Sequence, residues 1–151
     1  MAQSLTKIYI HLIFHIKNTS PKILSQDLER VHAYIGQLIN ESTCTNIWVN
    51  GVEDHVHILF LLSREVSVSH VVEEVKRNSS RWIKTLARHY TTFAWQAGYA
   101  AFSVSESIAE KTLNYIKNQK EHHKRLTFSE EYKKFLELNH IEFNDEHVFR
   151  D

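Results

Sequence analysis

The chain has 151 residues, a length that suits one domain built on one hydrophobic core. Hydrophobic residues make up 42% and charged residues 24%, which excludes a long disordered protein. Lys and Arg total 18, as do Asp and Glu, so the net charge gives no support for a nucleic-acid partner. Only local clusters of basic residues could indicate one. A lone cysteine, Cys44, excludes an internal disulfide, and no segment is typical of a signal peptide or a membrane span. We therefore expect a cytoplasmic protein without a membrane partner.

The first two thirds of the chain alternate between strand-like and helix-like patterns. Segments rich in β-branched and aromatic residues predict strands at Thr6–Ile16, Thr45–Val52, His55–Leu62 and Tyr99–Val104. Apolar residues at helical spacing predict helices over about 28–39 and 67–86. The order βαββαβ predicts an α+β, ferredoxin-like fold, in which both helices cover one face of an antiparallel sheet.

Turns and boundaries complete this outline. Only Glu53 and Asp54 separate the second and third strands, which predicts an antiparallel hairpin. Glycine and proline are scarce, at 3 and 1 residues, and no linker or repeat divides the chain. We expect one domain over residues 1–151, with its core at about 5–105.

The remainder of the chain, about 106–151, predicts two appended helices. A capping-box pattern at Ser107 and Glu110 opens the first, which we expect to run to about His123. The second spans about Ser129–Leu138. Their apolar residues must be buried against the open face of the sheet or against a partner subunit.

Two histidines on the third strand form a candidate metal chelate. Alternate side chains of a strand share a face, so His55 and His57 point the same way, close enough to bind one ion. The chain has 11 histidines, however, so about one such pair is expected by chance. The pair alone therefore favours two ordinary polar histidines, and for His11 and His15 on the first strand a structural role is preferred.

The first appended helix carries a second candidate group. Tyr115 and Gln119 are four residues apart and so share a helix face, with His122 one turn further. The apolar stripe runs through Leu113 and Ile116, which places Tyr115 beside it, where a phenol can meet a substrate. Taken singly, Tyr115 is interpreted as a boundary residue with a hydrogen-bonded hydroxyl.

Four ordered blocks, GVEDHVHILF, EEVKRNSSRWIK, WQAGYAAFSVSES and LNYIKNQ, together resemble the single-tyrosine HUH transposases and their repeat-associated relatives. The resemblance covers nearly the whole chain and implies a ferredoxin-like core. It implies that His55 and His57 are metal ligands, Gln119 the third ligand and Tyr115 the catalytic nucleophile. It also implies a homodimer in which the tyrosine helix of one subunit can serve the histidine pair of the other. The tail over 126–151 is longer than the most compact members require.

The resemblance implies a strand transferase that cleaves and rejoins single-stranded DNA, with hairpin ends of a mobile or repeated element as its substrate. A divalent cation, Mg²⁺ or Mn²⁺, acts as a Lewis acid, and imidazole ligands suit Mn²⁺. A 5′-phosphotyrosine ester conserves the energy of the broken bond, which suits rejoining better than hydrolysis. Two alternatives stay open: a non-catalytic module, or domesticated relative, that only binds single-stranded nucleic acid, and a metal-binding regulatory dimer.

A basic side of the second helix is the candidate DNA surface. Its cations and its hydroxyl suit phosphate contacts, although a solvated helix face explains them equally well. Trp95 could stack on a base, but a core role is preferred for so large an aromatic residue. The candidate DNA-binding residues are Lys76, Arg77, Ser80, Arg81 and Lys84.

Overall fold

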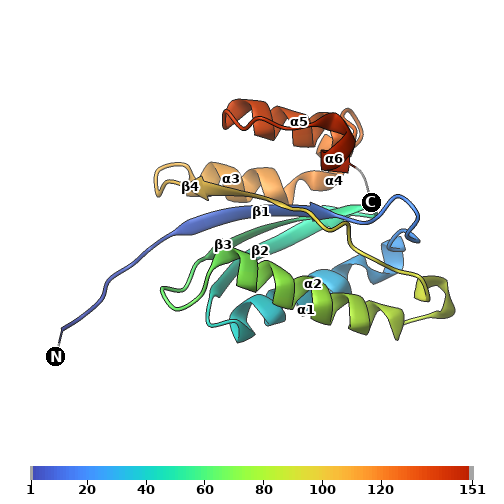
Figure 1. Ribbon diagram of the computed structural model, residues 1–151, viewed down its shortest axis with the longest axis horizontal. Helices are drawn as coiled ribbons and strands as arrows, with labels where there is room; N and C mark the ends of the chain where they lie inside the picture. The colour runs from blue at the N-terminus through green and yellow to red at the C-terminus, as the bar shows by residue number, and fades with distance from the viewer. Residues whose placement is uncertain (1, 150–151) are drawn as a thin grey trace.

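A computed structural model describes residues 2–149, and its centre is one four-stranded sheet in the order β2-β3-β1-β4 (Figure 1). Every neighbouring pair of strands is antiparallel. The predicted α+β, ferredoxin-like βαββαβ fold is thereby confirmed. The strands are β1 (Tyr9–His15), β2 (Thr45–Val52), β3 (His55–Leu61) and β4 (Ala100–Val104).

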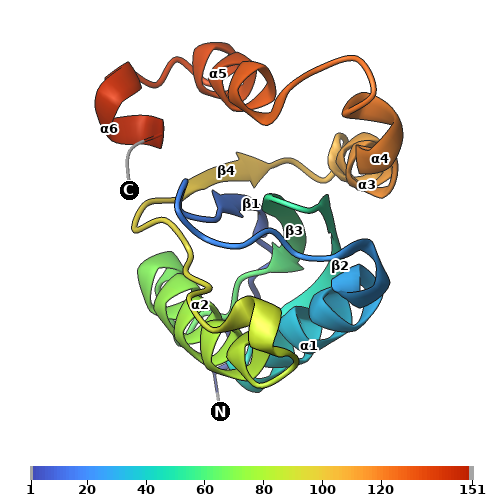
Figure 2. The ribbon, with the colours of Figure 1, turned by 90° about the vertical axis from the view of Figure 1, so that its right-hand side faces the viewer.

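Helices cover both faces of the sheet (Figure 2). One face carries α1 (Leu28–Glu41) and α2 (Val68–Lys84), as predicted, with short 3-10 turns at Ser25–Asp27 and Arg88–Tyr90 beside them. The opposite face carries the C-terminal third of the chain, which closes the surface that a bare βαββαβ unit would leave open. Its helices are α3 (Ala109–Lys117), α4 (Gln119–His122), α5 (Phe128–Leu138) and α6 (Asp145–Phe149).

Strand alternation divides the sheet residues between these two layers. On the two central strands, Leu12, Phe14 and Ile58 face the main core beneath α1 and α2. Their neighbours in the sequence point to the other layer, where Ile13 packs with β4 and α5. Trp95 is buried in the main core and donates a hydrogen bond to Ser79, which confirms its predicted core role.

The predicted β2–β3 hairpin is confirmed, because Val52 pairs with His55 and leaves only two residues in the turn. Gly51 lies just before this turn, very close to the backbone of the facing strand. A Cβ atom there would lie 2.2 Å from the carbonyl oxygen of His55. Only glycine lets the two backbones approach so closely, and the position of His55 depends on it.

Two predicted boundaries were wrong. The first strand begins at Tyr9, which pairs with Leu61 and Val104, so the ladder starts only where both neighbouring strands are present. No side-chain cap forms at Ser107, whose hydroxyl contacts that of Ser105. The capping box occurs instead at Thr127, and α5 starts at Phe128.

The first appended helix is also divided in two at Asn118, whose backbone leaves the helical conformation. The side-chain amide of Asn50, on β2, donates hydrogen bonds to the carbonyl oxygens of Ile116 and Lys117 at 2.9 and 3.1 Å. These carbonyls therefore end α3 with satisfied partners from another element. Tyr115 and Gln119 lie on either side of this break.

Candidate metal and nucleophile site

The candidate site lies on the face of the sheet covered by α3 to α5. His55 and His57 both point there from β3, as the alternation predicted, and expose 1% and 0% of their surface. Gln119, from α4, brings its side-chain oxygen within 3.1 Å of Nε2 of His55. The two histidines and the glutamine predicted as metal ligands therefore lie together.

A buried carboxylate that the sequence reasoning missed stands at the centre of this site. Oε1 of Glu131, from α5, lies 2.9 Å from Nε2 of His57 and 3.2 Å from Nε2 of His55. His123 approaches the same oxygen at 3.1 Å, and Gln119 donates to Oε2 at 3.1 Å. Glu131 is 1% exposed, so its charge is balanced almost entirely by these groups.

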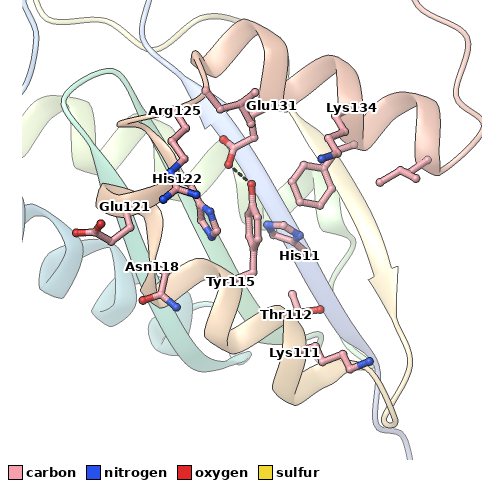
Figure 3. Close-up of a pocket in the computed structure, with 13 residues that line it drawn as sticks. His11, Lys111, Thr112, Tyr115, Asn118, Glu121, His122, Arg125, Glu131 and Lys134 are labelled. Carbon is pink, nitrogen blue, oxygen red and sulfur yellow. Dashed lines mark hydrogen bonds between the residues drawn. The ribbon is translucent and has the colours of Figure 1, made fainter.

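The hydroxyl of Tyr115 donates a hydrogen bond to Oε2 of the same carboxylate (Figure 3). The ring of His122 stacks on the phenol, with centroids 4.3 Å apart. The predicted nucleophile and the predicted ligands are thus joined through Glu131. Tyr115 and Gln119 were predicted to share the face of one helix, but they lie on two helices, because the chain leaves the helical conformation at Asn118 between them.

Burial and ion pairing shift the pKa values of the titratable groups of the site in opposite directions. Burial opposes the charged form of His55, but hydrogen bonds to Asp54 and Glu131 outweigh it and raise its pKa to about 9. Burial lowers the pKa of His57 to about 4, although Glu131 partly opposes this. Despite burial, the donors around Glu131 hold the pKa of its carboxyl far below the usual range. Burial and the bond to Glu131 raise the pKa of Tyr115 above its usual range.

A second layer of polar groups orients these side chains. Oδ1 of Asp54 lies 2.7 Å from Nδ1 of His55, which leaves Nε2 directed at the site. Nε2 of His11 lies 2.8 Å from Nδ1 of His57 in the same way. Nδ1 of His15 lies 3.0 Å from the carbonyl oxygen of Ile16, which is consistent with the structural role predicted for His15.

The donor atoms suit a divalent transition metal. The ligand atoms of His55, His57 and Glu131 lie within 4.8 Å of one another, and all three residues are buried. Two imidazoles with carboxylate and amide oxygens form a mixed set that suits Mn²⁺ or Zn²⁺ better than Mg²⁺. The imidazole nitrogens that now contact the carboxylate are free to bind metal once they carry no proton. This group could therefore hold a metal ion.

The sequence contained a pattern that could have identified Glu131 as a site residue. Phe128, Tyr132 and Phe135 form the apolar stripe of α5, and Glu131 falls within that stripe at helical spacing. A carboxylate on a buried stripe requires a partner, which makes it a candidate for a site. His123 stood beside His122 in the sequence, but nothing local distinguished their roles.

The basic residues belong to α2, which covers the face of the sheet opposite to α3, the helix that carries Tyr115 (Figure 2). Lys76 is half-buried and donates to the carbonyl oxygens of Gln96 and Gly98 at 2.7 and 2.5 Å. Burial lowers its pKa to about 8. Arg77 is paired with Glu74 at 2.5 Å.

The other three residues of this candidate surface lie on the same helix. Arg81 and Lys84 are exposed, and Ser80 is half-buried. The structure therefore does not bring the candidate DNA surface to the metal site, and DNA contacts by α2 remain a prediction.

Known proteins resemble this chain in sequence and in fold. The family model described as "Transposase IS200 like" matches residues 4–119. A solved transposase from Deinococcus radiodurans R1 superimposes with a TM-score of 0.60 and 19% identity, over 79% of this chain and 98% of that one. The REP-associated tyrosine transposase bound to a REP hairpin gives 0.59 and 12%, over 82% of this chain and 73% of that one.

No curated protein matches this sequence. None of the helices within residues 2–149 has the length and apolarity needed to cross a membrane. The family match covers more than half of the chain, including β1 to β4, the histidine pair and Tyr115. The chain belongs to the IS200-like transposase family.

Proposed function

We propose that this protein is a metal-dependent transposase of the HUH type that cleaves and rejoins single-stranded DNA through a phosphotyrosine intermediate. The convergence of Tyr115, His55, His57 and Gln119 on the carboxylate of Glu131 carries this proposal. A nucleophile, metal donors and a buried charge within hydrogen-bonding distance are the parts that phosphoryl transfer requires. A module that only binds nucleic acid has no need of them.

In this proposal His55, His57 and Gln119 hold the cation, and Glu131 is a further ligand. When bound, the cation supplies positive charge that stabilises the phenolate and the phosphoryl oxygens. In the present arrangement the proton stays on Tyr115, because its pKa is raised and that of Glu131 is lowered. The hydrogen bond from the phenol to Oε2 therefore orients the nucleophile.

The reaction transfers the phosphate to the protein. The phenolic oxygen of Tyr115 bonds to phosphorus and loses its proton as the bond from phosphorus to the 3′ oxygen breaks. The departing 3′ oxygen takes up a proton to become a hydroxyl, and the tyrosine keeps the 5′ phosphate. Attack by the 3′ hydroxyl of another strand reverses the step and releases the tyrosine. The intermediate is about as energetic as the bond it replaces, so rejoining needs no external energy source.

The proposed function also includes a substrate and an oligomeric state. The REP-associated tyrosine transposase with a similar fold binds a REP hairpin, which supports single-stranded DNA with a hairpin as the substrate here. We also propose a homodimer, in which the tyrosine helix serves its own site or the partner's. Tyr115 and the histidine pair meet within one described chain, so one subunit already contains every proposed group.

The test is covalent capture of DNA. Labelled single-stranded DNA from the flanks of the gene is incubated with the protein and Mn²⁺, and the adduct is digested and analysed by mass spectrometry. We expect a phosphorylated nucleotide on Tyr115, and none in the Tyr115→Phe variant, which should bind Mn²⁺ and DNA as before. Tyr9, half-buried at the start of β1 and away from the site, provides the matched Tyr9→Phe control. Cleavage at an undiminished rate by Tyr115→Phe would overturn the tyrosine mechanism.

A further inference from the structure

A pocket of about 750 Å³ opens directly beside Tyr115 (Figure 3). It lies between α3, α5 and the segment that follows α4, with Tyr115 and Glu131 in its wall. Its volume falls within the range of sites for small ligands, and it suits one nucleotide better than a duplex. A ligand in this pocket would reach the Tyr115 hydroxyl.

Three cations from separate parts of the fold line this pocket. Lys111 lies on α3, Arg125 follows α4, and Lys134 lies on α5. All three are exposed, and none forms an ion pair with another residue between 2 and 149. The lining carboxylates are already engaged, since Glu121 pairs with Lys124 at 3.0 Å and Glu131 faces the metal donors. The pocket therefore has free positive charge for a phosphate.

The wall of the pocket has aromatic rings for a base. His122 stacks on Tyr115 with a 21° angle between the ring planes, and Phe135 meets Tyr115 edge-on at 5.4 Å. Nε2 of His122 is buried and has no hydrogen-bond partner in the described part of the chain. A buried nitrogen without a partner is costly, and no hydrogen bond at this nitrogen holds the His122 ring in its present position.

We propose that this pocket binds one nucleotide of the single-stranded substrate, next to the phosphate that Tyr115 attacks. The base packs against the wall formed by His122 and Phe135, and Lys111, Arg125 and Lys134 contact the flanking phosphates. The inference rests on the proposed function and adds to it the surface that leads the strand to the nucleophile. It also gives DNA an entry on the same face of the sheet as the metal site, which α2 does not.

Salt-dependent binding tests the cations. A fluorescein-labelled single-stranded oligonucleotide of mixed sequence is titrated with protein at several salt concentrations and followed by anisotropy. Each phosphate contact to single-stranded DNA contributes roughly 0.7 to the log–log salt slope, so neutralising three cations should lower the slope by about 2. The pocket variant is Lys111→Gln, Arg125→Gln and Lys134→Gln combined.

A charge-matched variant of α2 is the control. Arg77→Gln, Arg81→Gln and Lys84→Gln combined remove the same charge from α2, the helix on the opposite face of the sheet. We expect it to keep most of the salt slope that the pocket variant loses. A slope lowered by the α2 variant and not by the pocket variant would overturn the inference while leaving the proposed function intact. Failure of the wild-type protein to bind the oligonucleotide would overturn both.

Photochemical crosslinking tests the base contact independently. 5-Iododeoxyuridine is placed at one position at a time around the cleavage site, with Tyr115→Phe protein to prevent cutting. We expect crosslinks to His122 or Phe135 from a position adjacent to the scissile phosphate. Crosslinks confined to α2 or to the exposed Trp48 would contradict the pocket as the nucleotide site.

Discussion

Replacing Glu131 with Gln should destabilise the metal-free protein and weaken its binding of Mn²⁺. The amide keeps the size of the side chain but removes the negative charge that faces His55 and His57 at 3.2 and 2.9 Å. Its NH₂ group would also face the donors that now approach Oε2. Removing one partner of a buried ion pair costs about 3–5 kcal/mol, and an isosteric change should fall near 3 kcal/mol.

Three measurements on the Glu131→Gln variant, each repeated on a control variant, test this prediction. Urea unfolding in EDTA should show the loss of about 3 kcal/mol, and calorimetric titration with Mn²⁺ should show an affinity about 10-fold lower or more. In NMR titrations the pKa of His55 should fall from about 9, because Glu131 is one of the two groups that raise it. Glu137→Gln, an exposed change on the same helix, should stay within about 0.5 kcal/mol of wild type. Equal stability and Mn²⁺ affinity for both variants would refute the central position of this carboxylate.

Three further predictions concern pH, backbone packing and assembly. The pKa of His55 is raised from 6.5 to about 9, so its contribution is complete below pH 6.5 and is lost as pH rises through 9. In EDTA, the free energy of unfolding should fall over this window by about 3 kcal/mol, and a flat profile would contradict the ion pair. Gly51→Ala places a Cβ 2.2 Å from the carbonyl oxygen of His55 and should cost about 2 kcal/mol or more and weaken Mn²⁺ binding. Gly98→Ala, where the nearest atom is the tip of a side chain, should cost less than Gly51→Ala in the same unfolding assay. Light scattering should report twice the 17.8 kDa chain mass, and a mass near 17.8 kDa at micromolar concentration would contradict the dimer.

Local pattern alone determined the framework of this protein. Period-two alternation placed His55 and His57 on one face of β3, and the two-residue turn before them set the hairpin register. The order of strands and helices was sufficient for the ferredoxin-like sheet, because short connections and antiparallel pairing leave few other arrangements. These features depend on neighbours in the sequence, so they can be deduced without the fold.

Tertiary contacts decided which polar groups meet. Glu131 joins the site from 74 residues beyond His57, and Asn50 ends α3 from another strand. Lys76 looked like a phosphate-binding cation but is held by backbone carbonyls on the far face of the sheet. Periodicity specifies the face on which a side chain lies, whereas its partner, its pKa and its distance from the nucleophile depend on which distant segment packs against that face.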